Sequence, residues 1–313
     1  MKHATLFLIL AVAFTGTAFG HNGLTNFLPT VPDPLAINID GVEDDWDWYD
    51  RDFANTDIIS ILGQKKGQGV NPAPDDFSMA WFMAWSPPPD NAFYFFARVK
   101  DDTLRAGWGN EKANWWDDDN LNLMFDADHG GGPVTGNEDI NEISNGYRYH
   151  LSPLYTNEVG PHAGGLAGPG ENDDFQPFSI QPRNMRYRTT VAPADAGHLT
   201  PNVEYTFELK AKLWDIYDVS GESASTPHVF APDQVLHIVV QFEEGDEGPH
   251  GESDFWGQAG APEVNGMVDA DQAADALCLL TADIENYPDS FAGTGTAVEH
   301  VTWARIKNHF RSE

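Results

Sequence analysis

The sequence of 313 residues has little cysteine, little positive charge and few long apolar runs. Cys278 is the single cysteine, so the chain cannot form an intramolecular disulfide and something else must hold its loops. Lys and Arg together number 17 against 49 Asp and Glu, which gives a net charge of −32. A charge of this sign and size repels phosphate backbones and anionic lipid heads. It therefore argues against nucleic acid and membrane surfaces as partners.

The one long apolar run lies at the start of the chain. It covers residues 4–14, follows Lys2 and His3, and is followed by small residues that end at Gly20. This is the pattern of a signal peptide, and the run is too short for a membrane span, which needs about 20 apolar residues. We expect residues 1–20 to be removed and residues 21–313 to be secreted, to the extracellular space or periplasm, as a single domain without membrane insertion.

Signatures of common enzyme classes are also missing. The sequence contains no Gly-x-Ser-x-Gly elbow, no His-x-x-x-His pair, no phosphate loop and no Cys-x-x-Cys. Acidic residues are plentiful, but sequence spacing alone does not identify the carboxylate pair that glycoside hydrolysis needs. We predict no catalytic residue, and hydrolysis of glycosidic bonds stays open as an alternative.

Short strand patterns dominate what the sequence does contain. The clearest runs from Val203 to Leu213, where apolar residues alternate with Glu, Thr and Lys as in a strand with one solvated face. Further strand runs lie at 77–85, 93–99, 120–125, 147–151, 185–191, 235–242 and 301–306, with long polar loops at 63–76, 130–144, 160–176 and 245–260. The pattern predicts an all-β, antiparallel jelly-roll sandwich with at most one or two short helices. An apolar stripe predicts one helix, Asp269 to Leu280.

Clustered carboxylates are a second feature of the chain. Hard oxygen ligands from several loops suit calcium, which would brace segments that no disulfide holds. We predict structural calcium with Asp40, Glu43, Asp102 and Asp126 as ligands. Solubility in a salty medium explains the same acidity equally well, and both interpretations stay open.

The aromatic residues follow two patterns. Trp81, Trp85, Phe93 and Phe95 lie inside strand patterns and are predicted to pack in the core, whereas Trp116 follows Trp115 among polar residues just before a strand. An exposed indole can stack on the C–H face of a sugar ring while polar neighbours bond its hydroxyls. The alternative for Trp116 is a loop anchor under a sheet edge.

Five segments, in order, resemble family-9 carbohydrate-binding modules over nearly the whole mature length. They are residues 39–46, 92–102, 116–126, 205–209 and 302–306. The resemblance implies a jelly roll with structural calcium and a sugar slot between two facing Trp side chains. It assigns sugar contacts to Trp116, Arg148 and Gln241. Asn122 stands where the family has Glu, and Tyr287 or Phe291 is the aromatic residue nearest to the second Trp position.

We therefore predict a secreted, non-catalytic protein, braced by calcium, that binds a poly- or oligosaccharide. The predicted sugar contacts are Trp116, Asn122, Arg148, Gln241 and Tyr287. We also expect association with a separate glycoside hydrolase or with a cell surface. Two alternatives stay open, a calcium-stabilised surface or structural assembly protein and a glycoside hydrolase component. A haem-binding domain with Met79 and Met83 as axial ligands is a third, although buried Met is usually core.

Overall fold

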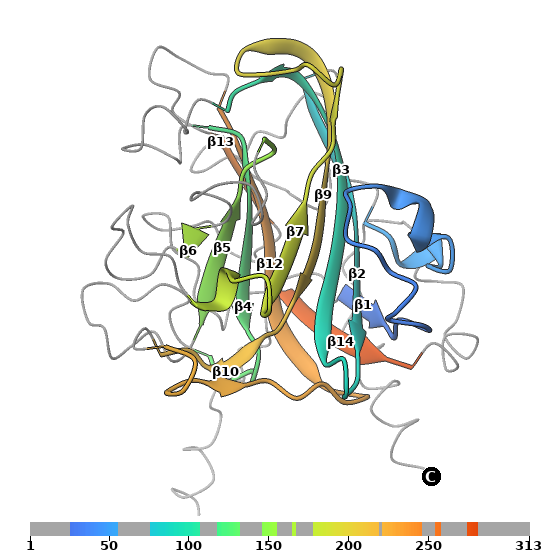
Figure 1. The fold of residues 1–313 in the computed structure, drawn as a ribbon, viewed down its shortest axis with the longest axis vertical. Coiled ribbons are helices and arrows are strands. Elements are labelled where there is room, and N and C mark those ends of the chain that lie inside the picture. The colour runs from blue at the N-terminus through green and yellow to red at the C-terminus, as the bar shows by residue number, and fades with distance from the viewer. Residues whose placement is uncertain are drawn as a thin grey trace, which may run out of the picture.

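The computed structural model describes residues 26–55, 76–106, 118–131, 146–154, 165–166, 178–218, 221–245, 254–257 and 274–280 (Figure 1). The predicted signal peptide at 1–20, the strand predicted at 301–306 and most of the predicted loop residues lie outside these ranges. Regular structure in the described chain is almost entirely β. Its helices are short 3-10 turns at Glu43–Trp46, Arg51–Phe53 and Phe178–Ile180. No helix in these ranges is long and apolar enough to cross a bilayer.

One sheet, called the large sheet below, joins strands from both ends of the described chain. Its order is β1 (Asn26–Pro29), β14 (Ala274–Leu279), β12 (Val235–Glu244), β4 (Asn120–Asp126), β5 (Tyr147–Leu151) and β6 (Gly165–Leu166), and β13 (Asp254–Gly257) also pairs with β12. β1 runs parallel to β14, and the other strand pairs of this sheet are antiparallel.

A second sheet, called the small sheet, is antiparallel throughout. Its order is β2 (Phe77–Ser86), β3 (Ala92–Leu104), β9 (Thr200–Ala211) and β7 (Met185–Arg188), and β8 (Val191–Ala192) also pairs with β9. A two-stranded ribbon of β10 (Trp214–Ile216) and β11 (Thr226–Pro227) lies apart from both sheets. The predicted all-β sandwich is confirmed.

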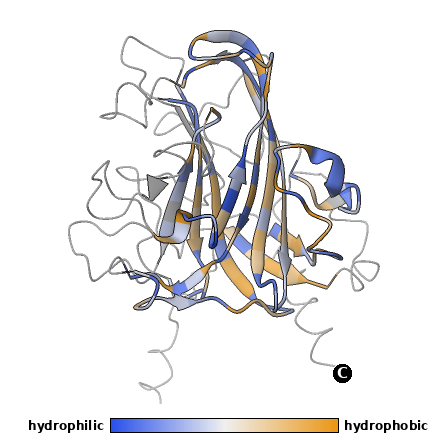
Figure 2. Cartoon of the chain, in the orientation of Figure 1, coloured by the Kyte–Doolittle hydropathy of each residue, from blue (hydrophilic) through white to orange (hydrophobic). Residues whose placement is uncertain are grey.

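The core lies between the two sheets and is built from apolar residues of both (Figure 2). Trp81, Trp85 and Phe93 are fully buried there, as the sequence predicts, and so is Phe95. Burying each such ring stabilises the fold by about 2 to 3 kcal/mol. Met79 and Met83 also lie in this core, as expected of buried Met.

The N-terminal segment covers the outer face of β2 and β3, where Trp46 and Tyr49 pack on Phe82. Glu208 anchors it, because its carboxylate accepts hydrogen bonds from the indole of Trp46 and the backbone N–H of Gly41. Burial raises the pKa of Glu208 to about 7. Gly41 has φ of 85°, and a Cβ there would lie 2.9 Å from the backbone of the facing strand connection.

The structure corrects two expectations from the sequence. The predicted helix at Asp269 to Leu280 is wrong, because Ala274–Leu279 forms strand β14. Ala276 and Cys278 face the main core while Leu277 and Leu279 pack on the opposite side, so both faces are apolar and the sequence pattern fits either structure. The predicted loop at 245–260 contains β13, which pairs with β12.

Candidate functional site

The outer face of the large sheet carries polar side chains. Leu121, Leu123 and Phe125 of β4 point into the core. Side chains alternate along a strand, so Asn120 and Asn122 point to the other face. The same alternation on β12 sends Val240 and Phe242 inward and Gln241 and Glu243 outward. These outward positions would be solvated on an ordinary sheet, yet all four polar side chains are buried.

Strand register brings five of these residues side by side. We call them the polar row: Asn120, Asn122, His150, Gln241 and Glu243. Asn122 on β4 lies opposite Gln241 on β12 and opposite His150 on β5. The Glu243 carboxylate accepts hydrogen bonds from the side-chain amides of Asn120 and Asn122, the second at 2.7 Å. His150 Nδ1 lies 3.3 Å from Asn120 Oδ1. The row is a hydrogen-bonded network that spans three strands.

The side-chain amide of Asn122 is hydrogen-bonded on one side only. Asn122 donates to Glu243 through Nδ2, but its Oδ1 is buried and accepts no hydrogen bond from the residues that the structure describes. A buried acceptor left in this state costs about 1 to 3 kcal/mol. Asn122 Oδ1 is therefore a point where a hydroxyl donor would be stabilised.

The structure brings together two of the predicted sugar contacts. Asn122 and Gln241, far apart in the sequence, are direct neighbours in the polar row. Arg148 pairs with Met124, so its backbone lies two residues along β5 from His150. Trp116 and Tyr287 lie outside the described residues.

The predicted metal ligands have different partners. Asp40 accepts a hydrogen bond from the backbone N–H of Val42, and Glu43 forms ion pairs with Arg51 and Arg98. Asp126 accepts a hydrogen bond from His237. The fourth, Asp102, has a buried Oδ1 that accepts no hydrogen bond within the described part of the chain. The contacts do not gather these four residues into one group.

A different set of carboxylates does gather beside Asp102. We call Asp101, Asp119 and Glu244 the carboxylate cluster. All three are buried, and Asp119 accepts backbone hydrogen bonds at 2.6 Å and 2.9 Å. Burial raises the pKa of Asp101 to about 6. Burial, followed by the charges of Asp101 and Glu244, raises the pKa of Asp119 well above its ordinary value. Carboxylate oxygens are the ligand type that calcium prefers.

Comparison with known proteins bears on the fold. No protein-family model matches the sequence, and no curated protein matches it. A family-9 carbohydrate-binding module from Caldicellulosiruptor kristjanssonii, solved with cellotriose, matches with a TM-score of 0.50 at 12% identity, over 84% of this chain and 98% of that one. The chain has the fold of a family-9 carbohydrate-binding module.

Two further solved structures are similar to it. A family-9 module from the same organism, in complex with glucose, has a TM-score of 0.49 and 12% identity, covering 82% of this chain and 96% of that one. A protein from Bacteroides uniformis, described as carbohydrate-binding, has a TM-score of 0.46 and 9% identity, covering 82% and 99%. The family-9 fold that the sequence resemblance implies is confirmed.

Within this family-9 fold, sequence reasoning missed three members of the polar row, Asn120, His150 and Glu243. Each alternates with core residues, as in Asn-Leu-Asn-Leu at 120–123 and Gln-Phe-Glu at 241–243. Polar residues at every second position of a buried strand were the available signal.

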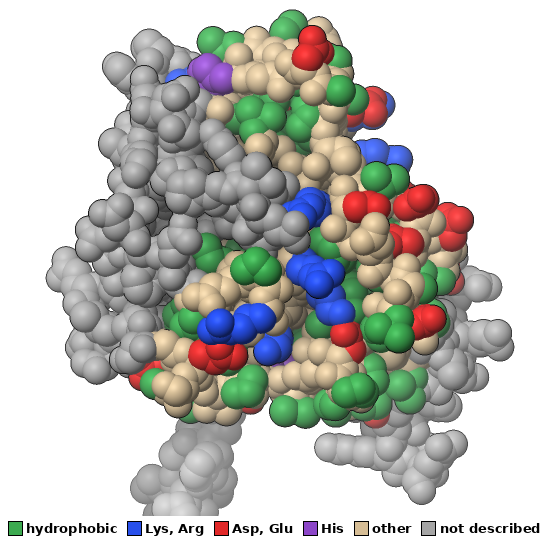
Figure 3. Space-filling model, viewed as in Figure 1, with side chains coloured by type: hydrophobic (Ala, Val, Ile, Leu, Met, Phe, Trp, Pro, Cys, Tyr) green, Lys and Arg blue, Asp and Glu red, His purple; other side chains and the backbone are tan. Residues whose placement is uncertain are grey.

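The few basic side chains gather elsewhere in the family-9 fold. Figure 3 shows a group of Lys and Arg over β7 and β9, on the outer face of the small sheet, where Arg186 and Lys210 are register partners. This group of basic side chains lies on the other sheet from the polar row, whereas Arg148 is on β5 of the large sheet.

Proposed function

We propose that this protein binds a poly- or oligosaccharide, without catalysis, at the outer face of the large sheet. The observation that carries the proposal is the pairing of Asn122 with Gln241 inside a network of amide, imidazole and carboxylate groups. Sugar hydroxyls both donate and accept hydrogen bonds, and such groups match them on both counts. The matched family-9 modules were solved with cellotriose and with glucose, which supports a sugar as the ligand.

Each residue has a separate role in the proposed site. Asn122 Oδ1 accepts a hydroxyl hydrogen, while Glu243 holds the amide of Asn122 in position. Gln241, next to it in register, bonds a second hydroxyl. Trp116 supplies a stacking surface, with Arg148 and Tyr287 as further contacts. The polar row is buried, and hydrogen bonds made there are stronger because water is excluded.

Calcium belongs to the same proposal as a structural ion. The carboxylate cluster supports it, because Asp101 and Asp119 are buried and interact with each other, and the charge of Glu244 also acts on Asp119. A divalent ion there would neutralise carboxylates that otherwise repel one another. It would also join β3 to the start of β4 and the end of β12, which meet at one end of the polar row.

The cellular setting completes the proposal. A chain that loses residues 1–20 would act outside the cytoplasm, in association with a separate glycoside hydrolase or a cell surface. The strongly negative charge supports a partner that is neither nucleic acid nor anionic lipid.

Isothermal titration calorimetry with cellotriose and glucose tests the site. Asn122→Ala and Trp116→Ala should each weaken binding at least about tenfold, since each removes a contact worth about 1.4 kcal/mol or more. Asn38→Ala is the matched control, because Asn38 bonds Asp40 on the exposed N-terminal loop, and it should bind like the wild type. Equal affinity for wild type and Asn122→Ala would remove the polar row from the proposal.

A further inference from the structure

Two imidazoles and a carboxylate meet at the other end of the outer face of the large sheet. His237 lies on β12 and Asp275 on β14, and the two are register partners. His129 follows the end of β4, and its ring lies 3.8 Å from the ring of His237, centroid to centroid. One ligand atom from each of the three residues lies within 4.8 Å of the others. Among the described residues, this is the group of three donors that meets that distance.

The distances between these donors fit one small cation. His129 Nε2 lies 3.4 Å from Asp275 Oδ1, and His237 Nε2 lies 3.6 Å from the same oxygen. Four ligands at about 2.0 to 2.1 Å around tetrahedral zinc are separated by about 3.3 Å. The two measured distances, 3.4 Å and 3.6 Å, are within a few tenths of an ångström of this ligand-to-ligand separation. The side chains therefore need only a small adjustment to share an ion.

Asp126 fixes the orientation of one of these rings. Its Oδ2 lies 2.9 Å from Nδ1 of His237, and both side chains are almost fully buried. A carboxylate that accepts the Nδ1 hydrogen leaves Nε2 of a neutral imidazole with its lone pair directed outward. Carboxylate–histidine–metal arrangements of this kind orient the ligand and raise its basicity. Asp126 is thus placed to support a ligand, and His237 Nε2 faces Asp275.

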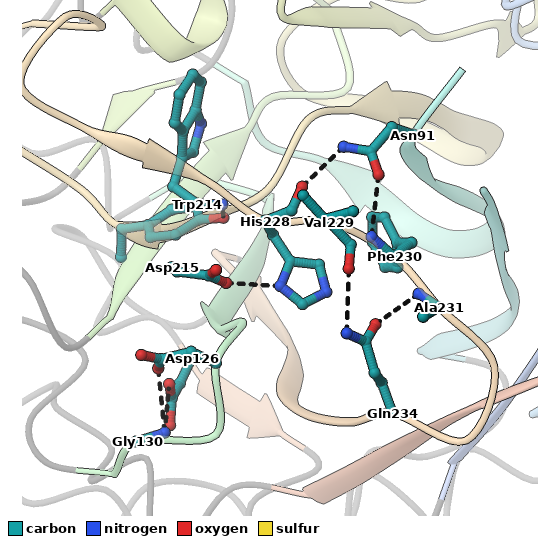
Figure 4. A network of polar contacts seen from close by, with 12 residues as sticks. Asn91, Asp126, Gly130, Trp214, Asp215, His228, Val229, Phe230, Ala231 and Gln234 are labelled. Carbon is teal, nitrogen blue, oxygen red and sulfur yellow. Dashed lines mark hydrogen bonds and ion pairs between the residues drawn. The ribbon is translucent and has the colours of Figure 1, made fainter. Parts of the chain in front are cut away.

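The loop after β4 holds the third ligand over the other two. The Asp126 carboxylate accepts hydrogen bonds from the N–H groups of Gly130 and Gly131, which folds the loop back on the strand end (Figure 4 shows Gly130). His129 has φ of 58°, a conformation that a residue other than glycine rarely adopts. Its side chain is 30% exposed, so an ion can reach the group from solvent.

We propose that His129, His237 and Asp275 bind a zinc ion, with Asp126 as the positioning residue for His237. Two imidazole nitrogens favour zinc over calcium, which prefers oxygen ligands throughout. The charge also balances, because the carboxylates of Asp126 and Asp275 match one divalent cation when both imidazoles are neutral. Three protein ligands leave a fourth position for water. The site is separate from the polar row and does not depend on the proposed sugar binding.

Zinc titration of the full chain tests the site, after the protein is stripped with a chelator and placed in excess calcium. The wild type should bind one zinc ion per chain in competition with a chromophoric chelator, and cobalt should give the visible spectrum of a tetrahedral site. His129→Ala should lower zinc affinity at least tenfold. Asp126→Asn should lower it by about 10 to 100-fold, as loss of a supporting carboxylate does. His198→Asn, which removes a histidine elsewhere, should leave affinity unchanged.

Folding is checked by circular dichroism, and Asp275→Asn provides a second ligand variant of nearly the same shape. The proposal is overturned if His129→Ala and Asp275→Asn, when folded, bind zinc as tightly as the wild type. Displacement of zinc by calcium, or absence of zinc binding by the wild type, would overturn it too. In the latter case the group would be a set of ion pairs between protonated histidines and Asp275.

Discussion

The two ends of strand β4 hold buried acidic residues in opposite chemical settings. Asp119 precedes the strand and Asp126 ends it, roughly 20 Å away at about 3.3 Å per residue. Near Asp119 the neighbours are carboxylates, and burial with their repulsion raises its pKa. Burial also acts to raise the pKa of Asp126, but hydrogen bonds from His237 and the Gly131 amide outweigh it and lower that pKa. Burial acts in the same direction on both carboxylates, and their different neighbours account for the opposite directions of the two pKa shifts.

The largest expected effect comes from removing the partner of Asp126. His237→Ala leaves a buried carboxylate without its imidazole, and breaking a buried pair costs about 3 to 5 kcal/mol. Urea unfolding in the presence of a chelator measures the free energy of unfolding. His198→Asn is the control and should change it by less than about 1 kcal/mol. A loss below about 1 kcal/mol for His237→Ala would mean that Asp126 is held by the loop amides alone.

At the Asp119 end of β4, the carboxylate cluster should make the folded chain less stable as pH rises. The folded chain holds the Asp101 proton up to about pH 6, whereas an ordinary Asp releases it near 3.8. Between these values the folded state binds more protons than the unfolded state, so stability falls as pH rises. The loss attributable to Asp101 is on the order of 3 kcal/mol. Asp101→Asn should flatten the curve of unfolding free energy against pH, measured from pH 4 to 7 with a chelator present. An unchanged slope would contradict the assignment.

At neutral pH, calcium should restore the stability that the folded chain loses when the carboxylate cluster is ionised. An ion at the carboxylate cluster stabilises the folded chain by about 2.7 kcal/mol at a concentration one hundred times its dissociation constant. Asp119→Asn should abolish this gain, while His129→Ala should keep it, because His129 lies at the other end of β4. Thermal unfolding with and without calcium gives the comparison. A gain that survives Asp119→Asn would place the ion elsewhere.

The smallest effect is expected for an acidic residue on the solvated face of the small sheet. Glu204 pairs with Lys100 at 2.9 Å, and both side chains are more than half exposed. Exposed pairs contribute about 0 to 1 kcal/mol. Glu204→Ala should therefore shift the urea midpoint only slightly. A shift as large as that of His237→Ala would show that solvent exposure does not predict the contribution of this ion pair to stability.

Much of the sandwich could be predicted from the sequence, because half-buried strands alternate. The run from Val203 to Leu213 predicts β9 almost to its ends, since one face is solvated. β14 could not be predicted in this way, because both of its faces are buried and Ala and Leu suit a helix equally well.

The candidate site was less accessible to sequence reasoning. The resemblance assigned Gln241 as a sugar contact, and Asn122, which stands where the family has Glu, was predicted as another. The register places the two side by side. Nothing in the local sequence links His129 to Asp275, which are far apart along the chain and meet because β14 lies beside β12. The carboxylate cluster likewise forms because β3, β4 and β12 come together in the fold. The abundance of Asp and Glu in the sequence suggested calcium, but only the strand topology determines which of these carboxylates lie near one another.

Because β1 pairs with β14, this edge of the large sheet can form only after nearly all of the described chain has been synthesised. Thr30 donates a hydrogen bond to the carbonyl of Leu279 across a separation of 249 residues, and the indole of Trp85 donates to the same carbonyl. The parallel strand pairing of β1 therefore forms only when almost the last described strand has emerged. Contacts of such long sequence separation form late and slow folding. A chain cut short before Ala274 would expose the backbone edge of β1 that pairs with β14, and an exposed strand edge promotes aggregation of nascent or truncated copies.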